Sequence, residues 1–162
     1  CLRVEDYPRQ LLRSGSMQHR LIDQTGMTNI KDVYFPEVGR YGMLIVAADI
    51  ENAAEPSRIM EAIWDTEPWR WIIIVDGDCN VRDWNEVMWR VVSAVQPERD
   101  TVLGRVFPPR RGERGEVDFI PPNRGMGIDA TMRCKPEKFP PVNKVRKRLM
   151  DEIAAKWHEY GL

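Results

Sequence analysis

The chain has 162 residues, of which 43% are hydrophobic and 30% charged, and its formal net charge is −1. That length suits one domain with a sizeable core, and the ordinary composition excludes a disordered, collagen-like or coiled-coil protein. No apolar run approaches the roughly 20 residues of a membrane span, and no signal-peptide pattern is present. Three cysteines without paired spacing argue against a disulfide framework or a zinc site and predict a cytoplasmic protein.

The first 35 residues carry the weakest pattern, and we expect them to form a lead-in to the domain. Within them, residues 16–23 are compatible with a short helix that ends before Gly26. The chain begins at Cys1 rather than at Met, so we expect a processed chain or a fragment of a larger protein.

An apolar run from Gly42 to Ala48 predicts a strand that is covered on both faces. A helix is expected to begin near Glu55, because Pro56 suits the first helical position, and to end before Pro68. A second buried strand is predicted from Trp71 to Val75.

The helix after this strand has a clear start. Asp83 is expected to cap it, and Glu86 is expected to complete a capping box. Its predicted buried stripe is Trp84, Val87, Met88, Val91, Val92 and Val95.

A third strand is predicted at Thr101–Phe107, followed by a long irregular loop over residues 108–124. Residues 127–132 are compatible with a short strand. A final helix is expected to reach about Tyr160, with an apolar stripe of Val145, Leu149, Ile153 and Trp157. Strands that alternate with helices imply right-handed crossovers, so the predicted fold is α/β, with a mostly parallel sheet flanked by helices.

Asp76, Asp78 and Asn80 follow a buried strand, at the edge where open α/β sheets usually hold their sites. The spacing is that of an EF-hand loop, but Val81 and Val87 stand where that loop needs Gly and Glu, which excludes it. A strand followed by Asp-x-Asp also resembles the metal and nucleotide-sugar site of some glycosyltransferases. The sequence favours a third interpretation, in which these side chains cap backbone amides in a tight turn.

Other chemistry has little support in the residues. The basic side chains between Arg99 and Arg148 suit a solvated surface or a subunit contact better than nucleic acid, because the chain as a whole is slightly acidic. One or two arginines remain candidates for gripping the phosphate of a small cofactor. His19, His158 and Cys79 have no partners in a recognisable nucleophile signature, so we identify no catalytic residue and no metal ligand.

Three motifs resemble, in order, the C-terminal domain of the UbiD family of prenylated-FMN-dependent decarboxylases. They are the run from Ile72 to Trp89 (Ile-Ile-Ile-Val-Asp-Gly-Asp-Cys-Asn-Val-Arg-Asp-Trp-Asn-Glu-Val-Met-Trp), Gln96-Pro-Glu-Arg-Asp-Thr-Val-Leu103 and Gly125-Met-Gly-Ile-Asp-Ala-Thr131. The resemblance covers most of this chain but only the C-terminal part of the family's chains. It implies a lead-in at residues 1–35, a UbiD-type domain at 36–141 and a C-terminal helix at 142–162 that makes an oligomer contact.

The resemblance implies part of a carboxy-lyase that acts on aromatic or α,β-unsaturated acids. Prenylated FMN, a divalent Mn or Mg ion and potassium would be held mainly by a flavin-binding part not present in this chain. That part and further copies of the chain are the expected partners, with a flavin prenyltransferase to supply the cofactor and neither nucleic acid nor a membrane. This domain would close over the flavin and substrate, with Val106 and Phe107 as the pocket wall and Arg70 as the cation for the flavin phosphate.

Two alternatives stay open at this point. A non-catalytic assembly or regulatory subunit would keep the domain without the chemistry. A metal-dependent nucleotide-sugar enzyme would use Asp76 and Asp78.

Overall fold

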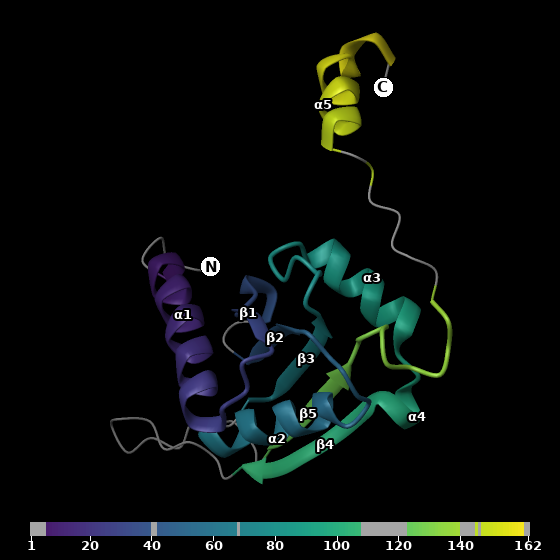
Figure 1. The fold of residues 1–162 in the computed structure, drawn as a ribbon. Coiled ribbons are helices and arrows are strands. Elements are labelled where there is room, and N and C mark those ends of the chain that lie inside the picture. The colour runs from purple at the N-terminus through teal and green to yellow at the C-terminus, as the bar shows by residue number, and fades with distance from the viewer. Residues whose placement is uncertain are drawn as a thin grey trace.

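The computed structural model describes residues 6–39, 42–67, 69–107, 123–139, 145 and 147–160 (Figure 1). A five-stranded sheet in the order β1-β2-β3-β5-β4 forms its centre. The elements are α1 (Asp6–Thr25), β1 (Ile30–Tyr34), η1 (Glu37–Gly39), β2 (Met43–Ala48), α2 (Glu55–Thr66), β3 (Trp71–Asp76), α3 (Trp84–Ala94), α4 (Pro97–Asp100), β4 (Thr101–Phe107), β5 (Asn123–Asp129), α5 (Lys147–Ala155) and η2 (Trp157–Tyr160).

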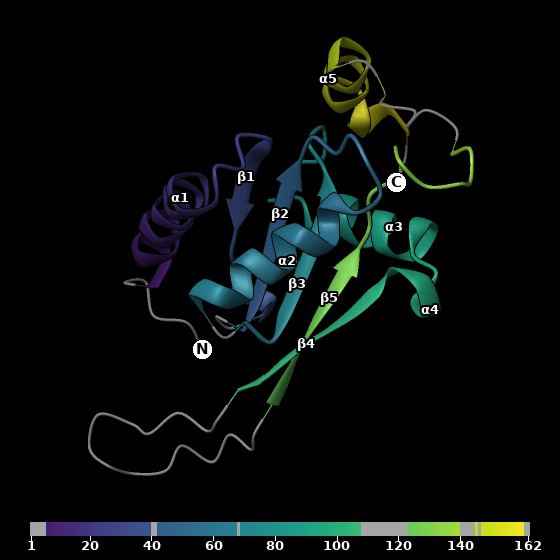
Figure 2. The same ribbon diagram turned by 60° about the horizontal axis from the view of Figure 1, so that its bottom comes forward.

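The predicted α/β fold is confirmed, with a sheet that is mixed in direction. β2, β3 and β5 run parallel to one another, whereas β1 and β4 pair antiparallel at the two edges. β4 joins the sheet antiparallel because it is paired directly with β5, the next strand of the chain, as the arms of a hairpin are. Figure 2 shows these two strands side by side.

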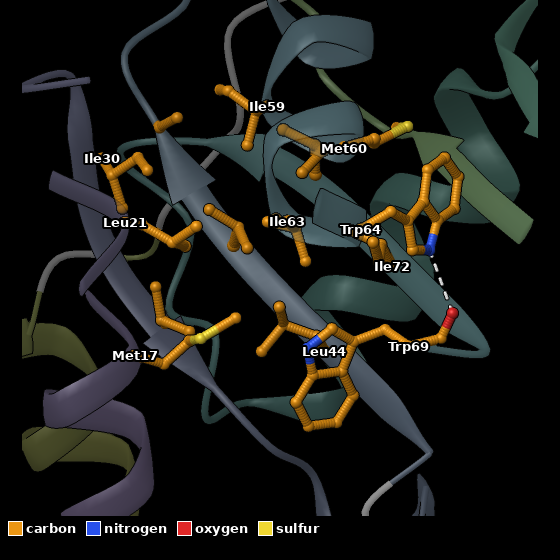
Figure 3. Packing of buried hydrophobic residues seen from close by; sticks show 14 of the residues in the cluster. Met17, Leu21, Ile30, Leu44, Ile59, Met60, Ile63, Trp64, Trp69 and Ile72 are labelled. Carbon is orange, nitrogen blue, oxygen red and sulfur yellow. Dashed lines mark hydrogen bonds between the residues drawn. The ribbon is translucent and has the colours of Figure 1, made fainter. Parts of the chain in front are cut away.

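One face of the sheet packs against α1 and α2, and Figure 3 shows the core between them. Leu44 and Ile72 of the sheet meet Ile63 and Trp64 of α2 there, all of them buried. The Trp64 indole donates a hydrogen bond of 3.0 Å to the Trp69 carbonyl, which satisfies its N–H in an apolar layer.

The opposite face carries α3, and here one prediction is wrong. Val87 and Ala94 of this helix are buried against the sheet, but Val92 is 79% exposed. Five residues beyond Val87, Val92 lies about 140° around the helix and therefore points away from the core. Arg90 lies on the buried face of this helix, where the sequence predicted only apolar side chains.

The N-terminal region is more regular than its sequence pattern predicts. α1 extends well beyond residues 16–23 and ends before Gly26, which has a φ of 68°. The short edge strand β1 was not predicted, because only Ile30 and Val33 of its residues are buried and the others give it a polar pattern.

The C-terminal helix appears as α5 followed by η2, and in both views it stands apart from the sheet (Figures 1 and 2). Val145, Leu149 and Trp157 of its predicted stripe are exposed. Residues 108–122, most of the predicted loop, lie outside the described residues. No helix in the described part of the chain is long and apolar enough to cross a membrane.

Candidate functional site

The acidic loop after β3 is organised around a buried arginine. Asp76, at the end of β3, and Arg90, on α3, are each 1% exposed, and their side chains form an ion pair of 3.0 Å. The same Asp76 oxygen accepts a 2.8 Å hydrogen bond from the Met132 N–H, beyond the end of β5. This contact ties β3, β5 and α3 together at the carboxyl end of the sheet.

Asp78 and Glu86 lie on the other side of the same guanidinium, at 3.2 Å and 3.4 Å. Burial lowers the pKa of Arg90, but the surrounding thiol and carboxylates outweigh it and raise that pKa above its usual value. Arg90 is therefore a permanent cation between the carboxylates. A metal ion has no place there, and the described residues contain no group of three acidic, histidine or cysteine side chains that could hold one.

The capping interpretation of this loop holds for Asn80, whereas Asp76 and Asp78 pair with Arg90 and, among the described residues, Asp76 accepts a backbone N–H only from the distant Met132. Asp83 accepts from the N–H groups of Asn85 and Glu86, at 3.0 Å and 3.3 Å, and Asn80 accepts from the Arg82 N–H at 3.1 Å. The Glu86 carboxylate reaches the Asn80 N–H at 3.3 Å, while the Asp83 N–H donates to the Asn80 carbonyl. The predicted capping box is thus half formed: Asp83 accepts from the Glu86 N–H, but the Asp83 N–H donates to the Asn80 carbonyl and Glu86 accepts from the Asn80 N–H.

A second buried ion pair lies beside the end of β5. The Lys135 ammonium, 4% exposed in its side chain, donates to Asp100 at 2.7 Å and to the carbonyls of Ala94 and Asp129. Arg99 adds a bidentate contact to Asp100, with distances of 2.7 Å and 2.9 Å. Lys135 thereby fastens the end of α3, the end of α4 and the end of β5 to one another.

These contacts shift the ionisation of the two carboxyl groups in opposite directions. Burial works to raise the pKa of Asp100, but hydrogen bonds from Arg99, the Gln96 N–H and Lys135 outweigh it and lower the pKa to about 2. Burial dominates at Asp129 and raises the pKa of that carboxyl group. The Asp129 carboxylate accepts hydrogen bonds from the N–H and the hydroxyl of Thr131, at 3.0 Å and 2.7 Å.

A shallow cavity of about 400 Å³ opens beside this second ion pair. Its lining is Ala53, Ser57, Arg99, Asp100, Val102, Asp129, Thr131, Cys134, Lys135 and Pro136. Lys135 makes three hydrogen bonds to the protein and Arg99 is held by Asp100 and Glu137, so neither cation is left unpaired. The cavity contains no nucleophile and base in hydrogen-bond contact among the described residues.

The three predicted site residues lie at the opposite end of the sheet. Val106 pairs with Arg124 and Phe107 with Asn123, at the start of β5, and the Arg70 carbonyl accepts from the Met126 N–H at 2.7 Å. The amino ends of β3 and β5 therefore bring Arg70 close to the end of β4. Val106 is 59% exposed, Arg70 is exposed, and the side chain of Phe107 lies outside the described residues.

Sequence reasoning missed Arg90 and Lys135, the two buried cations. Arg90 had a signal, since it lies four residues after Glu86 and between Val87 and Val91 on the face that must be buried. Lys135 lies in an irregular stretch, where no sequence pattern indicated that it would be buried.

The fold is that of an α/β domain built on a mixed five-stranded sheet. Residues 12–130 match the family model of the 3-octaprenyl-4-hydroxybenzoate carboxy-lyase C-terminal domain, and the chain belongs to this family, the C-terminal domain of UbiD. The match covers all five strands.

Solved structures of UbiD-class enzymes share the fold. HmfF from Pelotomaculum thermopropionicum, in complex with FMN, is 20% identical with a TM-score of 0.63 over 86% of this chain and 32% of its own. The vanillic acid decarboxylase of Sedimentibacter hydroxybenzoicus in its open form is 16% identical (TM-score 0.63; 91% of this chain and 32% of its own). The apo 3,4-dihydroxybenzoic acid decarboxylase of Enterobacter cloacae is 13% identical (TM-score 0.62; 89% and 32%). The chain thus spans about a third of the length of these enzymes.

Proposed function

We propose that the chain is the C-terminal domain of a UbiD-like decarboxylase for aromatic or α,β-unsaturated acids, and that it closes over a flavin-bound substrate. The single observation that carries the proposal is the family match over residues 12–130, joined to a domain without a catalytic set among its described residues. HmfF and its evolved dimeric form were solved with FMN and with prFMN, which supports a flavin in the complete enzyme.

The amino end of the parallel strands is the end we assign to the substrate. It carries the exposed Val106 side chain and the Phe107 backbone at the end of β4, and exposed Arg70 close by. An apolar wall that excludes water strengthens the electrostatic interactions of a reaction in which charge develops. Such a lid needs no acid or base of its own.

Among the described residues, the one we assign to the cofactor is Arg70, which would contact its phosphate group. Arg70 has no ion-pair partner among them, so its guanidinium is available for a phosphate group. No described cluster suits a divalent metal, so we assign Mn or Mg, and potassium, to the flavin-binding part. The flavin, when bound, supplies the electron sink for decarboxylation.

The partners follow from this assignment. We propose the flavin-binding part of the same enzyme, further copies of the chain contacting through α5, and a cytoplasmic flavin prenyltransferase as the source of the cofactor. The exposed stripe of α5 supports the contact between copies. It equally favours the second candidate, a non-catalytic assembly subunit built on the same domain.

The experiment is a turnover assay. The complete enzyme that contains this domain is loaded with prenylated FMN, and carbon dioxide release is measured across a panel of aromatic and α,β-unsaturated acids. We expect release with at least one acid and none from the 162-residue chain alone. Bound flavin without release from any acid would favour the assembly subunit.

A further inference from the structure

The cavity beside the second buried ion pair has a carboxylate in its wall, that of Asp129. This residue ends β5, and it lines the cavity together with Ser57 of α2 and Val102 of β4. Figures 1 and 2 show the start of α2 close to the carboxyl end of β5. The cavity therefore lies at the opposite end of the sheet from Val106 and Arg70, outside the region that we assign to the substrate.

The described chain satisfies only one oxygen of the Asp129 carboxylate. Oδ1 accepts both hydrogen bonds from Thr131, one from its N–H at 3.0 Å and one from its hydroxyl at 2.7 Å. Oδ2 accepts no hydrogen bond from the described residues, and it is not sealed inside the protein as the unpaired Oδ1 of Asp76 is. A carboxylate oxygen in the wall of a cavity can accept from a donor that enters it.

The charges around the cavity leave Asp129 without a counter-charge. The two cations of the lining, Arg99 and Lys135, both pair with Asp100, and Arg99 also pairs with Glu137 at 2.7 Å. Lys135 reaches the Asp129 backbone carbonyl, at 2.8 Å, and not its carboxylate, which forms no ion pair with the described residues. Burial raises the pKa of Asp129, so a cation brought into the cavity would stabilise its ionised form.

The rest of the lining indicates which kind of cation fits. Ala53, Val102 and Pro136 give an apolar wall, and Ser57 adds a hydroxyl that makes no hydrogen bond to the described residues. None of the ten described lining residues is aromatic, so a quaternary ammonium ion would lack the aromatic faces that usually bind it. A primary ammonium ion instead offers N–H donors to the carboxylate and the hydroxyl, while a short alkyl chain suits the apolar wall.

We propose that this cavity binds a small primary amine in its ammonium form, with the nitrogen donating to Asp129 Oδ2 and the alkyl chain lying against Val102. The volume of about 400 Å³ falls within the range of roughly 300–1,000 Å³ of small-molecule sites. A carboxylate ligand is disfavoured, because it would face Asp129 while both cations of the lining are already paired. The site is separate from the proposed substrate end, and the proposal does not depend on the decarboxylase activity.

The first test compares three probes by saturation-transfer NMR titration of the complete protein that contains this domain. We expect n-butylammonium chloride to bind in the millimolar range. Butan-1-ol lacks the charge and tetramethylammonium chloride lacks the N–H donors, so both should bind about tenfold more weakly or worse. No binding of n-butylammonium, or equal binding of either of the other probes, would overturn the proposal.

The second test locates the bound amine with variants. Asp129→Asn keeps an oxygen for the two bonds from Thr131 but removes the charge, and it should weaken n-butylammonium binding about tenfold or more. Ala53→Leu, which fills the cavity from an exposed position, should also weaken binding without altering a charge.

Asp23→Asn is the matched control, because Asp23 is an exposed aspartate of α1 that does not line the cavity, and it should leave binding unchanged. Thermal unfolding checks that each variant keeps its fold. Wild-type affinity in either Asp129→Asn or Ala53→Leu would overturn the proposal. Turnover is not measured, so a failure here leaves the proposed function unaffected.

Discussion

Arg90 is the residue on which the carboxyl end of the sheet depends. Its guanidinium is buried and forms an ion pair of 3.0 Å with the buried Asp76. Arg90→Met would leave this carboxylate in an apolar setting without its counter-charge, and we expect a loss of roughly 3–5 kcal/mol in the free energy of unfolding. Urea denaturation followed by circular dichroism measures it.

Arg82→Met is the matched control for that variant. Arg82 also pairs with an aspartate, Asp32, but both side chains are more than a third exposed. Its loss should cost no more than about 1 kcal/mol. Equal losses for the two arginines would contradict the assignment of Arg90 as a buried structural cation.

Asp100 gives the fold a dependence on acid. Its pKa is about 2 in the folded chain, below the ordinary value of 3.8. A lowered carboxyl pKa stabilises the fold above the ordinary value, and that contribution, about 2 kcal/mol here, disappears as the pH falls from 4 to 2. Asp100→Asn should be less stable at neutral pH and lose less stability over this acidic window.

Stability curves measured at several pH values for wild type and Asp100→Asn check this expectation. Glu137→Gln is the control, because Glu137 contacts the same Arg99 but lies on the surface. Wild type and Asp100→Asn with parallel curves between pH 4 and pH 2 would show that Asp100 titrates normally.

At the scale of the elements, two glycines let the α2 helix approach the sheet. A Cβ on Gly104 would lie 2.6 Å from the Trp64 ring, and one on Gly125 would lie 2.6 Å from its indole nitrogen and 2.8 Å from the Trp69 carbonyl. We expect Gly104→Ala and Gly125→Ala to lower the free energy of unfolding by roughly 1–3 kcal/mol each, through overpacking.

The control is the same substitution in an open position. Gly15 lies within α1 with nothing near its Cβ site, so Gly15→Ala should stabilise the chain by roughly 0.5–1 kcal/mol. Thermal denaturation of the three variants gives the comparison. A Gly125→Ala chain as stable as Gly15→Ala would mean that Trp64 does not lie against β5.

The sequence was sufficient for elements with a single strong pattern. The apolar runs of β2 and β3, the proline that opens α2 and the Asp83 cap of α3 are local features, and all are present in the structure. The direction of β4 and the existence of β1 depend on partners elsewhere in the chain, which no local pattern contains. The buried role of Lys135 has the same cause, because two of its three acceptors, the Ala94 carbonyl and the Asp100 carboxylate, lie 41 and 35 residues away in the sequence.

At the scale of the whole molecule, the proposed pocket wall makes a prediction for the complete enzyme. Val106→Trp, at the exposed end of β4, should raise KM for bulky aromatic acids at least several-fold while leaving small acids nearly unaffected, because the added ring occupies substrate volume. Val92→Trp on α3 should leave KM unchanged. Steady-state kinetics with a graded series of acids measures both, and equal effects would remove Val106 from the wall.

The two buried cations, Arg90 and Lys135, both lie where the parallel strands finish, and Val106 and Leu103 lie towards the other extremity. Substitutions should therefore be tolerated better at the amino end of the parallel strands than at their carboxyl end. A library randomised at Val106 and Leu103 should yield mostly folded proteins, whereas one randomised at Asp76 and Asp100 should yield few. New specificities would then arise at one extremity of the sheet without loss of the framework at the other.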